Sequence, residues 1–408
     1  MQSIWLLYLG TLCVWLYQLP YHVLMLSIVG AVYSSRRKRI VPGRDKRFVI
    51  LVPAHNEEAQ IAETLKSLKG LAYPKENVSI CVIADNCDDA TATRARECGV
   101  DVLERRDDSR RSKGFALEFA IHELHKKSHP PDAVVVIDAD TQVDAELLSY
   151  FAGRLAAGQE WIQAYYTVSN PEASLRTRWM TYAFSLFNGT WLWGQDALGL
   201  GCAFRGNGMA LSWSALQRVP WQAYGLAEDL EFSWYLRSQG ERIYFAPEAR
   251  VYGEMLPESG KAAEKQQLRW EHGRKELRQR YDLKIHEFAF APWQRYLLAA
   301  DLWMPPLSRY VSLLVLFASG TGLFAILFPE GSQAAYKCLQ FLLGLSFGSL
   351  GLYLLSPFVR LDLPLRYLGA LSTAPLYMLW KVRLLGSKAP TAWTRTERSA
   401  GKRDKSLR

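Results

Sequence analysis

An uncharged stretch at the amino end restricts the fold of this chain more than any other feature of its sequence. Residues 4–33 contain no Asp, Glu, Lys or Arg, and about 20 apolar residues suffice for a helix to cross a bilayer. A cleaved signal peptide would be shorter, and its positive charge would precede the apolar run; here the basic run 36–39 follows it. Residues 1–35 are therefore predicted to form one membrane-spanning helix, kinked near Pro20.

Two further apolar stretches lie toward the carboxyl end. Residues 307–328 and 335–357 are nearly free of charge and are separated by a short polar turn. The segment 307–357 is therefore predicted to form an out-and-back pair of membrane helices. The aromatic-rich segment 286–306 is predicted to form interfacial helices. In 362–385 the uncharged part is too short to cross, which favours an interfacial or re-entrant helix.

The positive charge of the chain, +9 net, gathers beside these apolar segments. Basic residues cluster at 36–39 and in the tail 386–408. This placement favours an anionic membrane surface over nucleic acid as the partner. By the positive-inside rule, the segment 46–285 and the tail lie in the cytosol. The charge pattern thus predicts a multi-pass protein of the inner (plasma) membrane with a cytosolic domain.

The central segment 46–285 has the pattern of an α/β domain. Short apolar runs at 48–52, 78–83, 100–103 and 133–137 alternate with amphipathic stretches. Such alternation is typical of buried strands separated by helices in a mainly parallel sheet. Ligands of these sheets bind beyond the carboxyl ends of the strands. We therefore expect the functional residues in the polar clusters that follow the strands.

Acidic residues follow three of the predicted strands. Glu57 comes after the first strand, Asp85 after the second, and Asp138 and Asp140 after the fourth. Carboxylates gathered at one sheet edge repel one another unless a cation lies among them. Mg²⁺ and Mn²⁺ prefer carboxylate oxygen and leave positions for phosphate, so the pattern predicts a divalent-cation site; a solvated turn is the alternative. Asn56 is predicted to cap the helix after the first strand.

Five short motifs follow one another in a fixed order along the central segment. They are Pro53-Ala54-His55-Asn56-Glu57, the cluster at Asp85, Asp138-Ala139-Asp140, Glu228-Asp229 and Gln266-Gln267-Leu268-Arg269-Trp270. Each motif is weak alone, but chance rarely gives this order and spacing. The segment resembles family 2 glycosyltransferases, the group that includes cellulose, hyaluronan and poly-N-acetylglucosamine synthases. The resemblance implies a GT-A type sheet flanked by helices, with membrane helices at both ends.

The resemblance also implies a role for each motif residue. Asp229 would be the catalytic base, and Trp270 and Asn207 would face the acceptor. The divalent cation would be held by Asp140 together with Asp138. The donor nucleotide would be bound by seven residues: Ala54, Glu57, Asp85, Lys113, Asp138, Gln266 and Arg269.

The assignment of Asp229 agrees with the chemistry of inverting transfer. One carboxylate must take the proton of the acceptor hydroxyl while the anomeric carbon is attacked from the face opposite the leaving group. Metal and cations stabilise the leaving diphosphate. The simpler alternatives are that Glu228 and Asp229 only favour the amino end of a helix, that Lys113 is an exposed helix start, and that Trp270 lies at the membrane interface.

These patterns predict an inverting, metal-dependent glycosyltransferase of surface polysaccharide or glycolipid assembly. The expected cofactor is Mg²⁺ or Mn²⁺. The expected partners are a nucleotide-sugar donor, with UDP favoured, a glycan or lipid-linked acceptor, membrane lipid, and polysaccharide assembly or export proteins. A processive polysaccharide synthase and a catalytically inactive nucleotide-sugar-binding scaffold are the alternatives.

Overall fold

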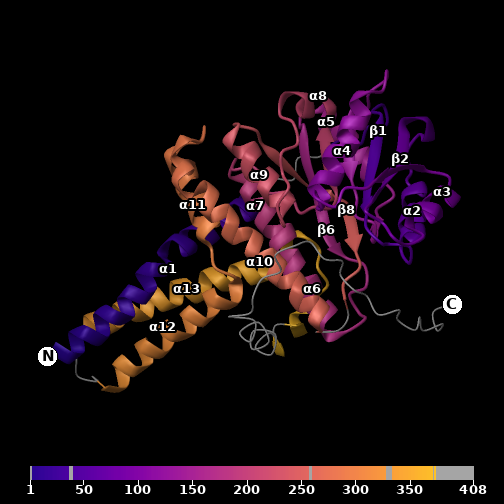
Figure 1. Cartoon of the computed structure of the whole chain (residues 1–408). Coiled ribbons are helices and arrows are strands. Elements are labelled where there is room, and N and C mark those ends of the chain that lie inside the picture. The colour runs from indigo at the N-terminus through magenta and orange to yellow at the C-terminus, as the bar shows by residue number, and fades with distance from the viewer. Residues whose placement is uncertain (1, 36–39, 257–259, 328–332, 371, 374–408) are drawn as a thin grey trace.

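The chain folds around an eight-stranded sheet with a bundle of long helices beside it (Figure 1). The computed structural model describes residues 2–35, 40–256, 260–327, 333–370 and 372–373. The strands lie in the order β3-β2-β1-β4-β7-β6-β8-β5. Their bounds are β1 (Phe48–Ala54), β2 (Val78–Asp85), β3 (Asp101–Arg105), β4 (Ala133–Val136), β5 (Thr141–Val143), β6 (Trp161–Val168), β7 (Met209–Ser212) and β8 (Ile243–Gly253).

The four strands expected from the sequence form the parallel half of the sheet. β1 pairs in parallel with β2 and β4, and β2 pairs in parallel with β3. In the other half β6 and β8 are parallel, whereas β7 and β5 run antiparallel to their neighbours. The predicted α/β fold with a mainly parallel sheet is confirmed, and the carboxyl ends of β1, β2 and β4 meet at one edge.

Helices cover both faces of the sheet because alternate residues of each strand point to opposite faces. Ile50 and Val52 of β1 belong to the core under α2 and α5, whereas Val49 and Leu51 belong to the core under α4. The helices of the sheet domain are α2 (Ile61–Lys69), α3 (Thr91–Glu97), α4 (Lys113–His125), α5 (Leu147–Ala156), α6 (Leu175–Phe184), α7 (Trp191–Ala197), α8 (Trp213–Arg218) and α9 (Glu228–Ser238).

The expected helix cap at Asn56 is wrong. α2 begins at Ile61, and no side chain caps it. Asn56 instead adopts a left-handed conformation with φ +58°, which Asn tolerates better than most residues. Its Oδ1 accepts a hydrogen bond from the N–H of Asp88 at 2.8 Å. Asn56 therefore ties the end of β1 to the loop after β2.

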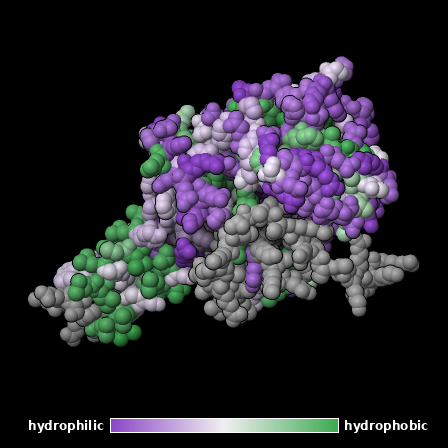
Figure 2. Space-filling view, viewed as in Figure 1, coloured by the Kyte–Doolittle hydropathy of each residue, from purple (hydrophilic) through white to green (hydrophobic). Residues whose placement is uncertain are grey.

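Three helices are long and apolar enough to cross a membrane: α1 (Gln2–Ser34), α12 (Leu307–Leu327) and α13 (Gln333–Arg360). They project side by side from the sheet domain (Figure 1). Their residues are mostly hydrophobic, whereas the visible face of the sheet domain is mostly hydrophilic (Figure 2). The helices lie close to the predicted ranges, and α1 continues through Pro20 as one helix. Their orientation in a membrane stays a prediction.

The predicted interfacial segments are described only in part. Residues 286–306 contain α11 (Pro292–Trp303), which follows the short helix η3 (Asp282–Glu287) and packs on α1 and α10 (Lys261–Tyr281). Of 362–385, the structure has the short helix η4 (Leu365–Leu368). Residues 371 and 374–385, the basic run 36–39 and the tail 386–408 lie outside the described residues.

α1 packs on two different partners along its length. In its middle, His22 is hydrogen-bonded to Tyr310 of α12 (Nδ1 to Oη, 2.7 Å), and Trp15 donates to Ser346 of α13 at 3.0 Å. Its carboxyl-terminal half is buried against the sheet domain. Ile28 has no exposed surface, and a Cβ on Gly194 of α7 would lie 2.8 Å from the Ile28 carbonyl oxygen. The same helix thus joins the apolar bundle to the sheet domain.

We expect Gly194→Ala to separate α1 from α7. The added methyl group meets backbone atoms of Ile28 that cannot rotate away, and such overpacking costs about 1–3 kcal/mol. Thermal unfolding of the detergent-purified protein measures the effect. Gly30→Ala is the control, because a Cβ on this α1 residue would meet nothing within 4 Å. Equal unfolding midpoints for the two variants would contradict the close packing of α1 on α7.

Candidate active site

The turn between β4 and β5 carries Asp138 and Asp140, and a buried amide holds its shape. Asn207 has no exposed surface. Its Oδ1 accepts a hydrogen bond from the N–H of Asp138 at 3.2 Å, and its Nδ2 donates to Thr141 Oγ1 at 2.7 Å. On the other side, the Thr64 hydroxyl donates to the carbonyl of Ala139 at 2.8 Å. These bonds fix where the two carboxylates leave the sheet.

Asn207 was expected to face the acceptor, and the geometry does not support that role. Both polar atoms of its side chain are used inside the protein, and none of its surface is exposed. The glycines on either side of Asn207 have backbone conformations that other residues rarely adopt. Gly206 and Gly208 have φ of +75° and +69°, a region that favours glycine. In this structure Asn207 is a positioning residue for the aspartate turn.

Lys113 lies at the centre of the acidic cluster. It begins α4, and its ammonium donates to Asp138 Oδ1 and to the carbonyl of Gly206, each at 2.5 Å. Glu228 Oε1 lies 3.7 Å from the same nitrogen. Only 16% of the Lys113 side chain is exposed, so it is not an ordinary exposed helix start. Its neighbour Gly114 permits this approach, because a Cβ there would lie 1.9 Å from the carbonyl oxygen of Ala223.

Asp229 lies on the first turn of α9, across Lys113 from the aspartate turn. Its Oδ1 accepts a hydrogen bond from the N–H of Leu230 at 2.8 Å. Its Oδ2 faces Gly206: a Cβ built on that glycine would lie 3.3 Å from Oδ2 and 3.5 Å from Lys113 Nζ. One carboxylate oxygen is thus held by the helix terminus, and the other points toward the space shared with Lys113.

The carboxyl groups of this cluster have perturbed pKa values. Burial raises the pKa of Asp229, and the nearby Asp138 raises it further, whereas the Leu230 N–H, Lys113 and Arg205 oppose the rise. Burial also raises the pKa of Asp138; Lys113 opposes this rise and Asp140 adds to it. A carboxylate whose pKa rises toward neutrality is better suited to take a proton.

Asp85 ends β2 at the same edge and is neutralised by an arginine. Arg105, the last residue of β3, donates to Asp85 Oδ1 at 2.7 Å, and Asn86 Nδ2 donates to the same oxygen at 3.1 Å. The sequence interpretation missed Arg105. No pattern within one segment marks it, because Arg105 becomes the register partner of Asp85 only in the parallel pair β2–β3. Ala54 ends the adjacent strand β1 and is buried.

Glu57 lies in the loop after β1, and its N–H donates to Thr91 Oγ1 at 2.8 Å. Thr91 begins α3, so this bond joins the loops that follow β1 and β2. The predicted donor residues Ala54, Glu57 and Asp85 therefore belong to neighbouring strand ends.

The last motif lies on α10, a helix that packs on α9. The backbone of α10 includes Gln266, Arg269 and Trp270, whose side chains lie outside the described residues. Further along the helix, a Cβ on Gly273 would lie 2.4 Å from the Cβ of Ala227. This close crossing sets the position of α10 against the start of α9.

The aspartate turn fits a divalent cation that is also held by phosphate. The described residues contain no group of three or more His, Cys, Asp or Glu side chains arranged for a metal ion. Asp138 and Asp140 supply two hard carboxylate ligands at an edge that also carries Lys113. Mg²⁺ is commonly held by one or two carboxylates with waters and substrate phosphates. The donor set therefore fits an ion that arrives with a nucleotide diphosphate.

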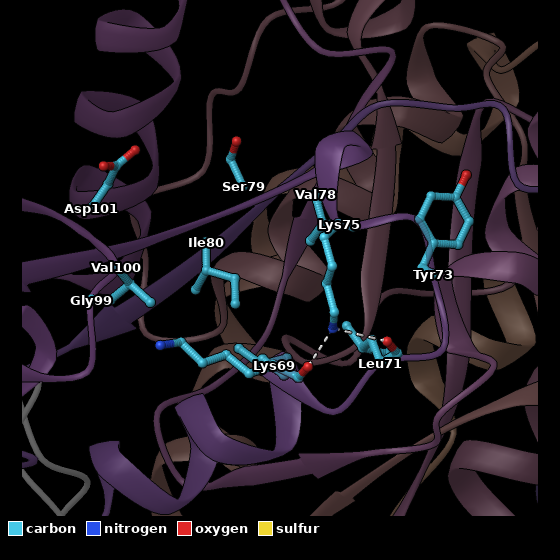
Figure 3. A pocket seen from close by; sticks show the side chains of 11 residues that line it. Lys69, Leu71, Tyr73, Lys75, Val78, Ser79, Ile80, Gly99, Val100 and Asp101 are labelled. Carbon is cyan, nitrogen blue, oxygen red and sulfur yellow. Dashed lines mark hydrogen bonds between the residues drawn. The ribbon is translucent and has the colours of Figure 1, made fainter.

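A separate hollow of about 480 Å³ lies at the other end of the strands, away from the aspartate turn. Tyr73, Val78 and Asp101 line it, and Lys75 donates to the carbonyls of Lys69 and Leu71 (Figure 3). β2 begins at Val78 and β3 at Asp101. The hollow is therefore at the amino ends of these strands, away from the aspartate turn, and takes no part in the candidate site.

Comparison with known sequences gives the same family as the motifs. The family model described as glycosyltransferase like family 2 matches residues 45–273. A probable glycosyltransferase of Bacillus subtilis, YdaM, is 26% identical over 287 residues, which are 66% of this chain and 66% of that protein. The beta-monoglucosyldiacylglycerol synthase of a Nostoc species is 28% identical over 228 residues, 52% of this chain and 46% of the relative. The chain thus spans about half to two thirds of these curated relatives.

Comparison with solved structures supports the fold. The mannosyltransferase PcManGT from Pyrobaculum calidifontis superposes with a TM-score of 0.54 at 18% identity, covering 87% of this chain and 98% of that one. At this identity the likeness concerns the fold.

The aspartate turn, Lys113 and Asp229 all lie within the residues that the family model matches. The resemblance drawn from the five motifs is therefore confirmed. The family model matches more than half of the residues of this chain, and the chain therefore belongs to glycosyltransferase like family 2.

Proposed function

We propose that this protein transfers a sugar from a nucleotide-sugar, with a UDP-sugar favoured, to a hydroxyl of a membrane-held acceptor, with inversion and with a divalent cation. The observation that carries the proposal is the position of Lys113. It separates the aspartate turn, which fits a cation and diphosphate, from Asp229, which fits a general base. The part of the site proposed for the donor and the part proposed for the acceptor thus lie on two sides of the Lys113 ammonium group.

Each side of the site has a separate task in this mechanism. Asp229 takes the proton of the acceptor hydroxyl through the oxygen that faces Gly206. Lys113 keeps Asp138 in place and adds positive charge near the leaving diphosphate. A divalent ion held by Asp138 and Asp140 would supply further charge stabilisation when bound. We assign Asp85, with Arg105, to the nucleobase side of the donor.

Relatives and neighbours support this proposal in their own chemistry. The Pyrobaculum mannosyltransferase is described in complex with GDP-Man and Mn²⁺. One curated relative is a synthase of a glycosyldiacylglycerol, and another is a poly-beta-1,6-N-acetyl-D-glucosamine synthase of Staphylococcus aureus, 26% identical over 271 residues, which are 61% of this chain and 62% of that protein. The lipid product named for the first of these relatives supports a membrane-held acceptor beside α1, α12 and α13, which we propose as inner-membrane spans with the sheet domain in the cytosol.

Asp229→Asn is expected to lower the rate of transfer by about 10²–10⁴-fold, the usual contribution of a general base. Asn keeps an oxygen for the Leu230 N–H, so the fold and donor binding are expected to persist. The measurement is release of nucleoside diphosphate from UDP-, GDP- and dTDP-sugars by detergent-purified protein with a membrane-lipid acceptor. A variant within a few-fold of wild type would remove Asp229 from the role of base. Donor binding without turnover by the wild type would favour the inactive scaffold.

Chelation is expected to abolish release, and Mg²⁺ or Mn²⁺ to restore it. Asp140→Asn should raise the metal concentration needed for half-maximal rate by at least about 10-fold, since even partners of metal ligands contribute that much to affinity. Asp45→Asn is the control, because this carboxylate is 69% exposed and lies outside the site. Full activity in the presence of chelator would contradict the proposed cation.

Lys113→Met is expected to move the acidic limb of the pH–rate profile to higher pH. Lys113 holds the pKa of Asp229 down, so its removal raises that pKa. A general base works only when ionised, and the rate therefore falls at a higher pH as the medium is acidified. Lys126→Met, at the exposed end of the same helix, is the control. A slower enzyme with an unmoved limb would show that Lys113 does not influence the base.

A further inference from the structure

A row of arginines connects the candidate base with the membrane helices. The guanidinium of Arg205 lies within electrostatic range of Asp229 and of Arg274 on α10. One turn further along α10, Arg278 lies within electrostatic range of Arg274 and of Arg309. Arg309 belongs to the first turn of α12. The row therefore runs from the reacting centre to the start of a membrane helix, along the helix α10 that Figure 1 shows between α9 and the bundle.

Two carboxylates, Asp229 and Asp301, lie within electrostatic range of this row of four arginines. Asp301 pairs with Arg274, whose Nη2 lies 3.8 Å from Asp301 Oδ1 and donates to its carbonyl oxygen at 2.9 Å. The same Oδ1 accepts from Trp191 Nε1 at 2.9 Å. Burial lowers the pKa of Arg205 and of Arg278, and Arg274 lowers both further; Asp229 and Asp301 oppose the shift at Arg205, and Tyr21 and Tyr17 oppose it at Arg278. A partly buried group of like charges is costly unless an anion lies among it.

Two buried donors near the row have no hydrogen-bond partner among the described residues. They are Nε of Arg205 and the hydroxyl of Tyr353 on α13. Tyr353 is 1% exposed and lies within electrostatic range of Arg205, Arg274 and Asp301. A buried donor without a partner costs about 1–3 kcal/mol. One donor of the sheet domain and one donor of a membrane helix near the row thus lack an acceptor oxygen among the described residues.

Aromatic residues mark the outer end of the row. The guanidinium of Arg278 lies over the ring of Trp303, 5.5 Å from its centroid. Arg278 is also within electrostatic range of Tyr17 and Tyr21 on α1. Trp303 and Tyr17 are exposed by 46% and 60%. Exposed Trp and Tyr beside basic residues are typical of the membrane–water boundary, where lipid headgroups lie.

We propose that Arg274, Arg278 and Arg309 bind the phosphate of an anionic amphiphile, and that this amphiphile is the sugar acceptor. Its tail would lie against the exposed apolar residues of α12, and its headgroup would follow the row toward Arg205. The acceptor half of this inference rests on the proposed function. A hydroxyl of the headgroup gives its proton to Asp229 and bonds to the anomeric carbon. The bond from that carbon to the diphosphate breaks, and its electron pair leaves on the diphosphate oxygen.

The binding half is tested without turnover. Short-chain phosphatidylglycerol carries a phosphate and free hydroxyls, and the matching diacylglycerol carries a hydroxyl without charge. Calorimetric titration of the full-length protein in detergent should show binding of the first and much weaker binding of the second. Arg278→Gln and Arg309→Gln should each weaken phosphatidylglycerol binding about tenfold, the loss expected for a charge-assisted contact. Added salt should weaken wild-type binding more than variant binding.

Lys275→Gln is the matched control, because Lys275 is an exposed residue of α10 outside the row. Equal binding of both lipids would overturn the phosphate site and indicate binding through the apolar tails alone. An equal loss in Lys275→Gln and Arg278→Gln would also overturn it and indicate unspecific attraction to anionic lipid.

The inference that the amphiphile is the acceptor is tested by a second measurement, whose failure can be distinguished from failure of the proposed function. With donor present, phosphatidylglycerol should accelerate nucleoside diphosphate release by wild type and by Lys275→Gln, but not by Arg278→Gln. Acceleration by diacylglycerol alone would overturn the anionic acceptor. If no donor is turned over although phosphatidylglycerol binds at the row, the proposed function fails while the phosphate site stands.

Discussion

The buried ammonium of Lys113 allows the acidic residues of this site to lie together. Asp138 and Glu228 are within ion-pair distance of it, and Asp229 is within electrostatic range. Burial alone would lower the pKa of Lys113, but these three carboxylates raise it, so the side chain stays charged. Without that charge, the carboxylates of the aspartate turn and of α9 would repel one another across the site. Two glycines permit this arrangement: a Cβ on Gly206 would lie between Asp229 and Lys113, and a Cβ on Gly114 would collide with the backbone of Ala223 against which the start of α4 packs.

Local sequence patterns predicted much of the fold but only part of the candidate site. The four parallel strands and the three long apolar helices are encoded in runs of neighbouring residues, so hydropathy and spacing located them. The partners of Lys113 are not local: Gly206 lies 93 residues away in sequence. The role of Asn207 depends on a turn 69 residues away, and the conformation of Asn56 on a loop 32 residues away. A pattern within one segment cannot supply such contacts.

The departures from prediction have a common physical cause. Asn56 and Asn207 are short amides with both donors and acceptors, so they join loops that secondary structure leaves unpaired. A motif read along the chain suggests a cap for the first and a ligand contact for the second. In the fold, both residues satisfy backbone groups of a neighbouring loop instead. Arg105 was missed for a related reason, since its partner Asp85 becomes adjacent only when β2 and β3 pair.

The packing of α1 explains why a row of charge can reach the base from the bundle. Because the carboxyl-terminal half of α1 is buried in the sheet domain, that domain cannot turn away from α12 and α13 without exposing Leu24, Met25 and Ile28. The orientation of the site toward the bundle is therefore fixed by hydrophobic burial. Charge then divides the site in two. Lys113 and Arg105 are neutralised by carboxylates on the donor side, whereas the row from Arg205 to Arg309 retains an excess of positive charge toward the bundle. An anion recruited by that excess would reach Asp229 from the bundle, whereas the cation and the diphosphate of the donor would lie at the aspartate turn.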